Sequence, residues 1–371
     1  MHIFSISALN FRSYELVELT LNSGITTFIG PNGQGKTNLI EIVDFSANLQ
    51  SHRSSLNSNL IRNSAPFAQT RVGVKEENKK IWIETRIEEK KALKIKVNSN
   101  PVKKHRDVAG LIKSTIFSPN DLSLIKGDPA TRRGFLDEVL VQNDRNYFDL
   151  KNEYEKILKQ KNALLKSVPK GDKNKSAAWS TLEIWNEKLA KTGSQIIYFR
   201  KKIIEALINP FIKNYNEIAP HTKDLQMSYN SNININNSTV EDIHAAYIFE
   251  LKNRKEEELA RSISLVGPHR DDFEIGLNSL PAKSQSSQGE AWSLALCLKL
   301  AMFDLLRETH KPILILDDVF SELDQFRREF LLKKIQDTEQ TIITAAVEED
   351  TPKNLFGDKY FINNSEITNE S

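Results

Sequence analysis

The chain carries Gly30-Pro31-Asn32-Gly33-Gln34-Gly35-Lys36-Thr37, which matches the phosphate-loop pattern G-x-x-x-x-G-K-[ST]. Glycine tolerates the sharp turns that point successive backbone N–H groups inward at phosphate oxygens. In this pattern Lys36 reaches the β- and γ-phosphates, where it is a catalytic candidate, and the hydroxyl of Thr37 ligates Mg²⁺. The alternative is a glycine-rich turn with a surface lysine. The eight residues together predict a site for ATP and Mg²⁺.

The residues around this loop have the context that the pattern requires. Gly24 to Gly30 is a short β-branched and apolar run, which suits a buried strand. From Thr37 to about Gln50, apolar residues recur at helical spacing. A helix that begins near Lys36 would add the positive end of its dipole to the loop.

A second candidate site is Pro312-Ile-Leu-Ile-Leu-Asp317-Asp318, an apolar run that ends in two carboxylates. Such a run fits a strand covered on both faces in a parallel sheet, whose ligands bind beyond the carboxyl ends of the strands. Neighbouring strand residues point to opposite sides, so the two acids should differ in role. We expect Asp317 to hold Mg²⁺ and Asp318 to orient or deprotonate the attacking water. The alternative is an acidic helix start that is favoured by the helix dipole alone.

Ser286-Ser287-Gln288-Gly289-Glu290 precedes a strongly helical segment, Ala291 to Leu306. A serine, a glycine and a helix start in sequence form a second anion-binding place. The alternative is ordinary capping, because Ser287 and Glu290 have the spacing of a capping box. The segment has no lysine, so if it binds phosphate it completes a site that begins elsewhere.

Two strand-rich parts flank a helical region. Residues 1–30 and 70–100 have the pattern of strands, and alternating segments return near Ser262. Between them, residues from about Thr131 to Tyr215 are mostly helical, with a polar loop at Ser167–Ser180. Two helices joined by a polar tip predict a helical hairpin.

At roughly 100–200 residues per domain, 371 residues correspond to two or three folded units. We predict an α/β fold whose head is built from residues 1–120 and 262–371, with a mainly helical lobe inserted at 121–261. The last ten residues are expected to fray.

Composition excludes several classes of protein. Lysine and arginine number 51 and aspartate and glutamate 49, a net charge of +2, which excludes a uniformly basic DNA-coating protein but not a local basic stripe. The single cysteine, Cys297, suits a reducing cytosol. No run of about 18 apolar residues and no signal-peptide pattern is present, so we expect a cytoplasmic protein with no membrane segment.

Three polar clusters keep two interpretations each. Gly267-Pro-His-Arg-Asp-Asp272 is either a solvated turn or a catalytic turn, although no serine or cysteine nucleophile is placed beside His269. Arg132-Arg133 serves phosphate or DNA, or is a surface pair at a helix start. The basic cluster Lys103–Arg106 meets nucleic-acid backbone or is simply solvated.

With these motifs in order, the chain resembles the RecF family of bacterial DNA replication and repair proteins, which belong with SMC proteins to the ABC-type ATPases. The resemblance covers nearly the whole chain. It rests on these blocks: Leu9–Tyr14, Gly30–Thr37, Phe117–Leu122 with Arg132–Asp137, Gly267–Asp272, Ser287–Glu290 and Leu316–Asp324.

The resemblance implies an ABC-type P-loop ATPase head with a mixed sheet, which forms a sandwiched dimer. ATP on the phosphate loop of one subunit is closed by Ser287 and Gly289 of the other. Arg12 resembles the arginine near the nucleotide in the family's first motif. Asp318 stands where most ABC proteins carry glutamate, a shorter carboxylate that suits slow hydrolysis.

The family also implies a function. An ATP-induced dimer clamps single- and double-stranded DNA at gaps or junctions, in recombinational repair, replication restart and the SOS response. RecR and RecO are the implied partners, and slow ATP hydrolysis resets the clamp.

Two features depart from the family or the wider ABC pattern. Glu290 stands where the family usually has glutamine. The histidine that many ABC proteins place after the next strand is absent after Thr341–Ala346, which leaves the γ-phosphate sensor unassigned.

Two other functions remain open. One is the ATPase subunit of an ABC transporter, against which 287 − 37 = 250 positions separate Thr37 from Ser287. The other is an SMC-like structural protein gated by nucleotide with negligible turnover.

Overall fold

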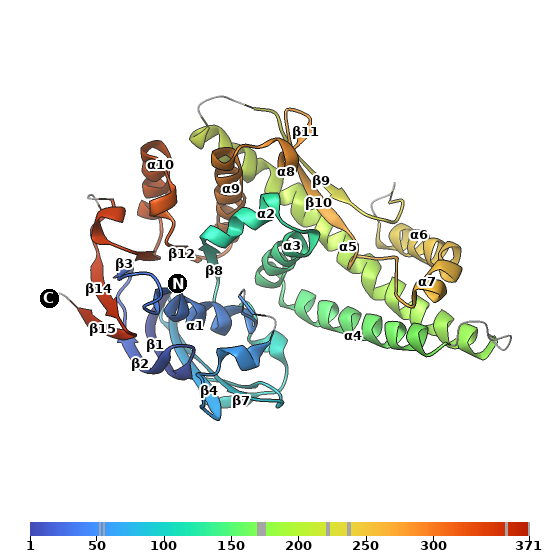
Figure 1. The fold of residues 1–371 in the computed structure, drawn as a ribbon, viewed down its shortest axis with the longest axis horizontal. Coiled ribbons are helices and arrows are strands. Elements are labelled where there is room, and N and C mark those ends of the chain that lie inside the picture. The colour runs from blue at the N-terminus through green and yellow to red at the C-terminus, as the bar shows by residue number, and fades with distance from the viewer. Residues whose placement is uncertain are drawn as a thin grey trace. The chain divides into compact units, whose positions relative to one another are not determined.

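The computed structural model describes residues 1–51, 53–54, 56–168, 176–219, 223–235, 239–352 and 355–369. The chain divides into two compact units. The head unit consists of Met1–Ile125, Asn209–Thr222 and Ser287–Ser371, and the helical unit consists of Lys126–Ile208 and Lys223–Ser286. Both ends of the chain therefore build the head unit (Figure 1).

The head unit is an α/β structure. Its strands are β1 (His2–Phe11), β2 (Tyr14–Thr20), β3 (Gly24–Ile29), β4 (Phe67–Glu76), β5 (Lys79–Glu88), β6 (Lys94–Val97), β7 (Asn100–Val102), β8 (Ser114–Phe117), β12 (Ile313–Asp317), β13 (Gln340–Ala345), β14 (Asp358–Asn363) and β15 (Glu366–Asn369). Its helices are α1 (Lys36–Asn48), α9 (Gln288–Arg307) and α10 (Gln325–Gln336), and α2 (Ser123–Lys126) ends at the boundary. Short 3₁₀ turns lie at Asn57–Leu60, His105–Asp107, Pro119–Leu122, Phe320–Glu322 and Glu348–Asp350.

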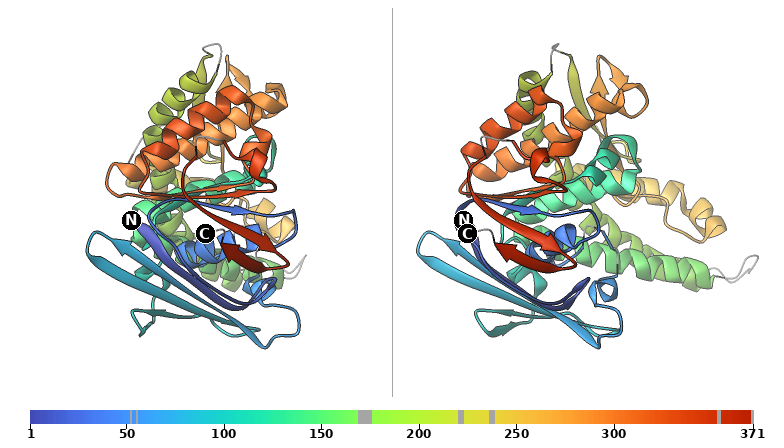
Figure 2. Two further views of the ribbon diagram at one scale, coloured as in Figure 1. Left: turned by 90° about the vertical axis from the view of Figure 1, so that its left-hand side faces the viewer. Right: turned by 60° about the vertical axis from the view of Figure 1, so that its left-hand side comes forward.

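Two six-stranded sheets form the head unit. One is antiparallel throughout, in the order β2-β1-β4-β5-β6-β7. The other has the order β15-β14-β3-β13-β12-β8 and is mixed, because β15 is antiparallel to β14 whereas the other neighbours are parallel. Strands from both ends of the sequence thus share this sheet, as expected. Figure 2 shows the red C-terminal strands beside the blue N-terminal ones.

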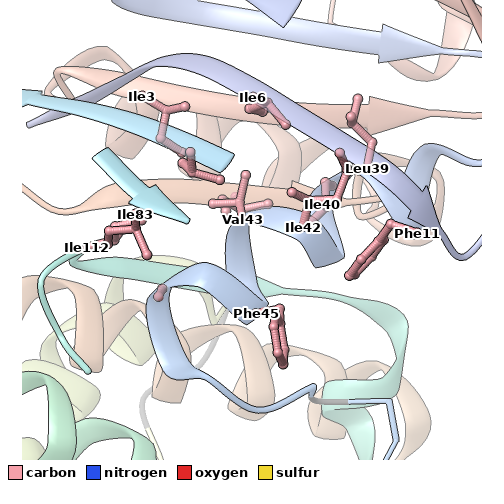
Figure 3. Close-up of a cluster of buried hydrophobic side chains, with 14 of the residues drawn as sticks. Ile3, Ile6, Phe11, Leu39, Ile40, Ile42, Val43, Phe45, Ile83 and Ile112 are labelled. Carbon is pink, nitrogen blue, oxygen red and sulfur yellow. The ribbon is translucent and has the colours of Figure 1, made fainter. Parts of the chain in front are cut away.

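Helix α1 packs against both sheets and is buried on nearly every side. The sequence predicted one apolar face, yet Glu41, Asp44 and Ser46 are buried as well. A helix in contact with two sheets has little surface left for solvent. Figure 3 shows its side chains clustered with Ile3 and Ile6 of β1, in a core that also takes in residues of β12 and β13. This packing fixes the helix start, where the phosphate loop ends.

The helical unit is built from two long helices, further shorter helices and a small sheet. Its helices are α3 (Pro129–Asn143), α4 (Arg145–Ser167), α5 (Ser176–Ile218), α6 (Val240–Asn253), α7 (Lys255–Arg261) and α8 (Ala282–Gln285). Strands β9 (Leu225–Asn230), β10 (Asp272–Leu277) and β11 (Leu280–Pro281) pair in the order β11-β10-β9. Helices α4 and α5 form the predicted hairpin (Figure 1). The rings of Tyr147 on α4 and Phe199 on α5 pack with their centroids 6.1 Å apart.

The unit boundaries differ from those expected at 120/121 and 261/262. They lie at 125/126 and 286/287, and 209–222 belongs to the head unit. The reason is strand pairing: β9 pairs with β10, which keeps the segment after residue 261 in the helical unit. Helix α5 continues past the boundary at residue 208, and Pro210 lies just beyond it.

Two local predictions need correction. The last ten residues were expected to fray, but Ile362–Asn369 lie in β14, β15 and the turn that joins them. The polar loop was expected to reach Ser180, but α5 begins at Ser176. The centre of that loop, 169–175, lies outside the described residues.

Candidate functional site

The phosphate loop joins the end of β3 to the start of α1. Lys36 is buried, and its ammonium donates hydrogen bonds to the carbonyls of Gly30 at 2.6 Å and Pro31 at 3.3 Å, and to Asn32 Oδ1 at 3.1 Å. Gly33 and Gly35 have φ angles of +84° and +113°, which favour glycine. Gly35 caps α1 without any side-chain hydrogen bond. The loop therefore wraps around the ammonium group of Lys36. Next to it, the first N–H groups of α1 can donate hydrogen bonds to an anion.

Asp317 and Asp318 lie at the carboxyl end of β12, as predicted. Asp317 Oδ1 accepts hydrogen bonds from the hydroxyls of Thr37 at 3.2 Å and Thr344 at 2.6 Å. The backbone N–H of Asp318 donates to the Thr344 hydroxyl at 2.9 Å. The strand end thus aligns one carboxylate with the threonine of the phosphate loop.

Asp318 has a different environment from its neighbour. Its φ of +53° turns the chain sharply, and its Oδ2 lies 3.7 Å from the ammonium of Lys36. Its Oδ1 is buried without a hydrogen-bond partner in the described structure. Burial raises the pKa of the Asp318 carboxyl, with Asp317 and Asp350 acting in the same direction and Lys36 against it. A buried carboxylate oxygen without a donor is available to a ligand or to water.

The oxygen atoms of Thr37 and Asp317 fit a magnesium ion. Mg²⁺ takes hydroxyl, carboxylate, phosphate and water oxygens. The Thr37 hydroxyl and Asp317 Oδ1 already lie within 3.2 Å of each other at the mouth of the loop. The sequence predicted both residues as ligands of Mg²⁺, and the structure brings their oxygens side by side.

Arg12 is held by a buried glutamate. Its guanidinium donates to Glu41 Oε2 at 2.9 Å and Oε1 at 2.7 Å, and to the carbonyl of Asn59 at 2.8 Å. Glu41, which is fully buried on α1, also pairs with Arg53. The neighbouring residue, Ser13, accepts a hydrogen bond from Asn38 in the first turn of α1. The hydrogen bonds of Arg12 itself go to Glu41 and Asn59.

Ser287 and Gly289 lie at the start of α9. Ser287 and Glu290 form the capping box: the Ser287 N–H donates to Glu290 Oε2 at 2.8 Å, and the Glu290 N–H donates to Ser287 Oγ at 3.3 Å. Within the described residues, no hydrogen bond joins Ser287 or Gly289 to residues 30–37. Arg327 of α10 donates to the Gly289 carbonyl at 3.3 Å and to Ser293 Oγ at 2.8 Å.

Sequence reasoning missed two residues of this region. Thr344 organises both aspartates, and it stands at the end of the strand that lacks the expected histidine. A hydroxyl at the carboxyl end of the neighbouring parallel strand was the available signal. Arg327 links α10 to the start of α9, a contact between segments that only folding brings together.

The Gly267–Asp272 segment lies in the helical unit, where Gly267, Pro268 and Asp271 are buried and Arg270 is exposed. Arg132 makes a two-bond ion pair with Asp272, both bonds 2.7 Å long, and Arg133 donates to the Asp271 carbonyl at 2.8 Å. The Tyr154 hydroxyl lies 2.6 Å from His269 Nδ1. Burial lowers the pKa of His269 to about 4 and raises that of Asp271 to about 6. These residues join helices to the small sheet, so neither a solvated turn nor a surface pair describes them.

The basic cluster Lys103–Arg106 follows β7. Lys103, Lys104 and His105 are exposed, and Arg106 is half-buried. In the part of the chain that the structure describes, no helix is both long and apolar enough to cross a membrane.

The fold and the site define a P-loop head of the ABC and SMC kind. The family model RecF/RecN/SMC N terminal domain matches residues 2–362. An SMC head from Pyrococcus furiosus, crystallised with the C-terminal domain of ScpA, matches with a TM-score of 0.54 at 15% identity, over 100% of this chain and 96% of that one. That likeness concerns the fold alone.

Relatives of higher sequence identity identify the family within this class of protein. A Streptomyces avermitilis protein described as "DNA replication and repair protein RecF" is 38% identical over 370 residues, which cover 99% of each chain. A Kineococcus radiotolerans protein of the same description is 38% identical over 375 residues, with 96% of each covered. A solved structure described as RecF-ATP in the RecFOR pathway matches with a TM-score of 0.91 at 31% identity, over 100% of this chain and 98% of that one. This chain belongs to the RecF family of DNA replication and repair proteins.

Proposed function

We propose that the chain is an ATP-dependent DNA-binding protein of recombinational repair and replication restart. In this proposal an ATP-bound dimer holds DNA at gaps or junctions, and slow hydrolysis releases it. The observation that carries the proposal is the meeting of two motifs: Lys36 lies 3.7 Å from Asp318, and Thr37 lies 3.2 Å from Asp317. These motifs are 280 residues apart in sequence, and they converge where open parallel sheets bind ligands.

Each residue of the loop has a chemical role in this proposal. The backbone N–H groups of residues 30–37 hold the phosphates, and Lys36 exchanges its present carbonyl partners for β- and γ-phosphate oxygens. Thr37 and Asp317 hold Mg²⁺. When bound, this ion neutralises charge on the phosphates.

Asp318 is the candidate for orienting or deprotonating water. Its unpartnered Oδ1 can accept a hydrogen bond from a water molecule, and Lys36 lies close enough to favour its charged form. An aspartate reaches less far than a glutamate, which is consistent with slow turnover. Hydrolysis then serves as a switch.

The second half of the site would come from another subunit. Ser287 and Gly289 start a capped helix and make no bond to the loop of their own chain among the described residues. We propose that Ser287 and Gly289 complete the site around the nucleotide that is bound by the partner subunit's phosphate loop. Arg12 is proposed as a further residue near a bound nucleotide. RecR and RecO are proposed partners from family membership.

The first test compares ATP-dependent DNA retention of the wild type with Lys36→Ala. We expect the variant to lose nucleotide-dependent retention. Lys311→Ala is a matched control, because Lys311 is exposed and precedes β12, at the end of the strand opposite Asp317. Equal retention by wild type and Lys36→Ala would defeat the proposal.

A second test separates a switch that hydrolyses ATP from a structural protein with negligible turnover. Single-turnover hydrolysis by the wild type and Asp318→Asn should differ by at least tenfold. Identical rates would remove Asp318 from catalysis, and a wild-type rate no faster than uncatalysed hydrolysis would favour the structural protein.

A third test asks whether Ser287 acts across subunits. Lys36→Ala and Ser287→Arg chains, each inactive alone, are mixed. If Ser287 acts in trans, a mixed dimer has one site with both changes and one intact site, so activity returns. If Ser287 served its own chain, both sites would be defective and mixing would restore nothing.

A further inference from the structure

The turn between β14 and β15 lies directly against the phosphate loop. The Ser365 N–H donates to the Gln34 carbonyl at 3.0 Å, and the Asn364 N–H donates to Gln34 Oε1 at 2.6 Å. The Ser365 hydroxyl also lies 2.8 Å from Ser13 Oγ, in the turn before β2. The C-terminal hairpin and the β1–β2 turn therefore meet on the loop. This turn lies beyond residue 362, where the family model's match ends.

The same hairpin packs closely against the phosphate loop at Gly30 and at Gly35. A Cβ atom on Gly30 would lie 2.2 Å from the carbonyl oxygen of Ile362 in β14. A Cβ atom on Gly35 would lie 3.2 Å from Ser365 Oγ and 3.0 Å from the hydroxyl of Tyr14. That hydroxyl donates to the Gly35 carbonyl at 3.1 Å, and burial raises its pKa, so it stays a neutral donor. Glycine is required at position 30 by the close neighbour alone, and at position 35 by close neighbours together with a φ of +113°.

The hydrogen bond from Ser365 to the Gln34 carbonyl restrains the orientation of one peptide group in the phosphate loop. Gln34 immediately precedes Gly35, the N-cap of α1. A hydrogen bond to the Gln34 carbonyl fixes the plane of the Gln34–Gly35 peptide, and therefore where the Gly35 N–H points. An N–H group preorganised toward a phosphate need not lose conformational freedom on binding.

We propose that Asn364 and Ser365 are positioning residues of the nucleotide site, which set its affinity by holding the Gln34–Gly35 peptide in its phosphate-binding orientation. The inference rests on the proposed function, because it requires that the loop bind nucleotide. It adds that the C-terminal hairpin, on the edge of the mixed sheet, contributes to that binding without touching the nucleotide.

The chain contains matched controls for this proposal. Asn98–Ser99 and Asn278–Ser279 are also Asn-Ser pairs with positive φ at both residues, in two-residue hairpin turns. Ser365 has a φ of +64° and Ser279 one of +63°. Ser279→Ala in the helical unit is thus the same substitution in the same kind of turn, at a hairpin of the other unit.

The experiment measures the Kd for Mg-ATP by calorimetry in the full chain. Gln34→Met removes the side-chain acceptor for Asn364, and Ser365→Ala removes the hydroxyl that meets Ser13. Each variant thus removes one of the two hydrogen bonds that keep the turn in place, with the Ser365 N–H on the Gln34 carbonyl. Each should weaken binding about three- to tenfold, in line with a net hydrogen bond of about 0.5–1.5 kcal/mol. In the double variant the Kd for Mg-ATP should rise by less than the product of the two single fold-changes, because both substitutions act on the same Gln34–Gly35 peptide. Ser279→Ala should bind like the wild type.

Thermal unfolding without nucleotide separates positioning from loss of structure. We expect unchanged midpoints in all four variants, since the turn and Gln34 are at least partly exposed. Wild-type affinity in both Gln34→Met and Ser365→Ala would overturn the inference, as would losses matched by lower midpoints. Lys36→Ala is the reference: if it abolishes binding while the turn variants do not, the proposed function stands and only this inference falls. If the wild type ignores Mg-ATP, the proposed function falls first.

Discussion

At the scale of single residues, the two aspartates of the site differ in the hydrogen bonds that their carboxylate oxygens accept. Asp317 and Asp318 are adjacent in sequence, but Asp317 accepts two hydroxyl hydrogen bonds whereas Asp318 Oδ1 accepts none in the described structure. Thr344 makes part of this difference, because its hydroxyl donates to one aspartate and accepts from the backbone of the other. One side chain thus positions two acids for separate tasks.

Thr344→Val is expected to lower the rate of ATP hydrolysis. The substitution keeps the shape but leaves the Asp317 carboxylate short of a donor, at a cost of about 1–3 kcal/mol. If this cost falls on the transition state, the rate drops by roughly ten- to hundredfold. Steady-state hydrolysis measures the effect. Thr344→Ser keeps the hydroxyl and should stay near the wild-type rate, and a fully active valine variant would show that the hydroxyl is dispensable.

His269 is expected to titrate near pH 4 instead of 6.5, because burial disfavours its charged form. The unfolded chain binds this proton more readily, so His269 contributes stability above pH 6.5 that is lost as the pH falls toward 4. The NMR shifts of the imidazole against pH give the midpoint directly. The same protein in urea provides the control, where the midpoint should return to the ordinary range. A midpoint above 6 in the folded protein would contradict the burial of this ring.

At the scale of elements, close approach decides where glycine is needed. Helix α5 carries Gly193, at which a Cβ atom would lie 2.4 Å from the ring of Tyr247 on α6 and 3.0 Å from that of Tyr154 on α4. Gly134 in α3 has nothing within 4 Å of the same position. Both are glycines inside helices of one unit, so sequence alone does not distinguish them.

Gly193→Ala and Gly134→Ala are therefore expected to change stability in opposite directions. The methyl group at 193 forces two tyrosine rings apart and should destabilise the helical unit by about 1–3 kcal/mol. At 134 the better helix propensity of alanine should stabilise by up to about 1 kcal/mol. Chemical unfolding followed by circular dichroism measures both. A neutral Gly193→Ala would mean that the tyrosines repack without cost.

At the scale of the whole molecule, charge must be unevenly distributed if the protein binds DNA. The net charge of +2 cannot attract a polyanion by itself, so the DNA-binding surface has to gather lysine and arginine from a balanced total of 51 basic and 49 acidic residues. Neutralising phosphates releases condensed counterions, which makes affinity depend on salt.

ATP-dependent DNA affinity is expected to fall steeply with salt. For 6–10 phosphate contacts the loss is on the order of 10³–10⁵-fold between 50 and 200 mM salt. Fluorescence anisotropy with labelled gapped DNA gives the slope, and the Kd for Mg-ATP over the same range separates loss of nucleotide from loss of DNA. A flat salt dependence would show that phosphate contacts do not dominate binding.

Much of the site was predictable because its chemistry lies in short segments. The loop at 30–37, the acidic strand end at 317–318 and the capped helix at 287–290 each follow from local pattern, and the structure has the expected elements at all three. The unit boundaries were less predictable, since the pairing of β9 with β10 joins residues more than 40 positions apart. The ordered C-terminal hairpin was missed because β14 gains its stability from β3 at the other end of the chain.

Sequence alone therefore determined the class of protein, the phosphate loop and the pair of acids, because glycine conformation, apolar periodicity and capping act over a few residues. Tertiary structure alone decided that Thr344 joins Asp317 to Asp318, that Glu41 holds Arg12, and that Asn364 and Ser365 rest on Gln34. These contacts join residues 26 to 331 positions apart. No local pattern encodes them, because a hydrogen bond at such separation exists only after two sheets and a helix have packed into one core.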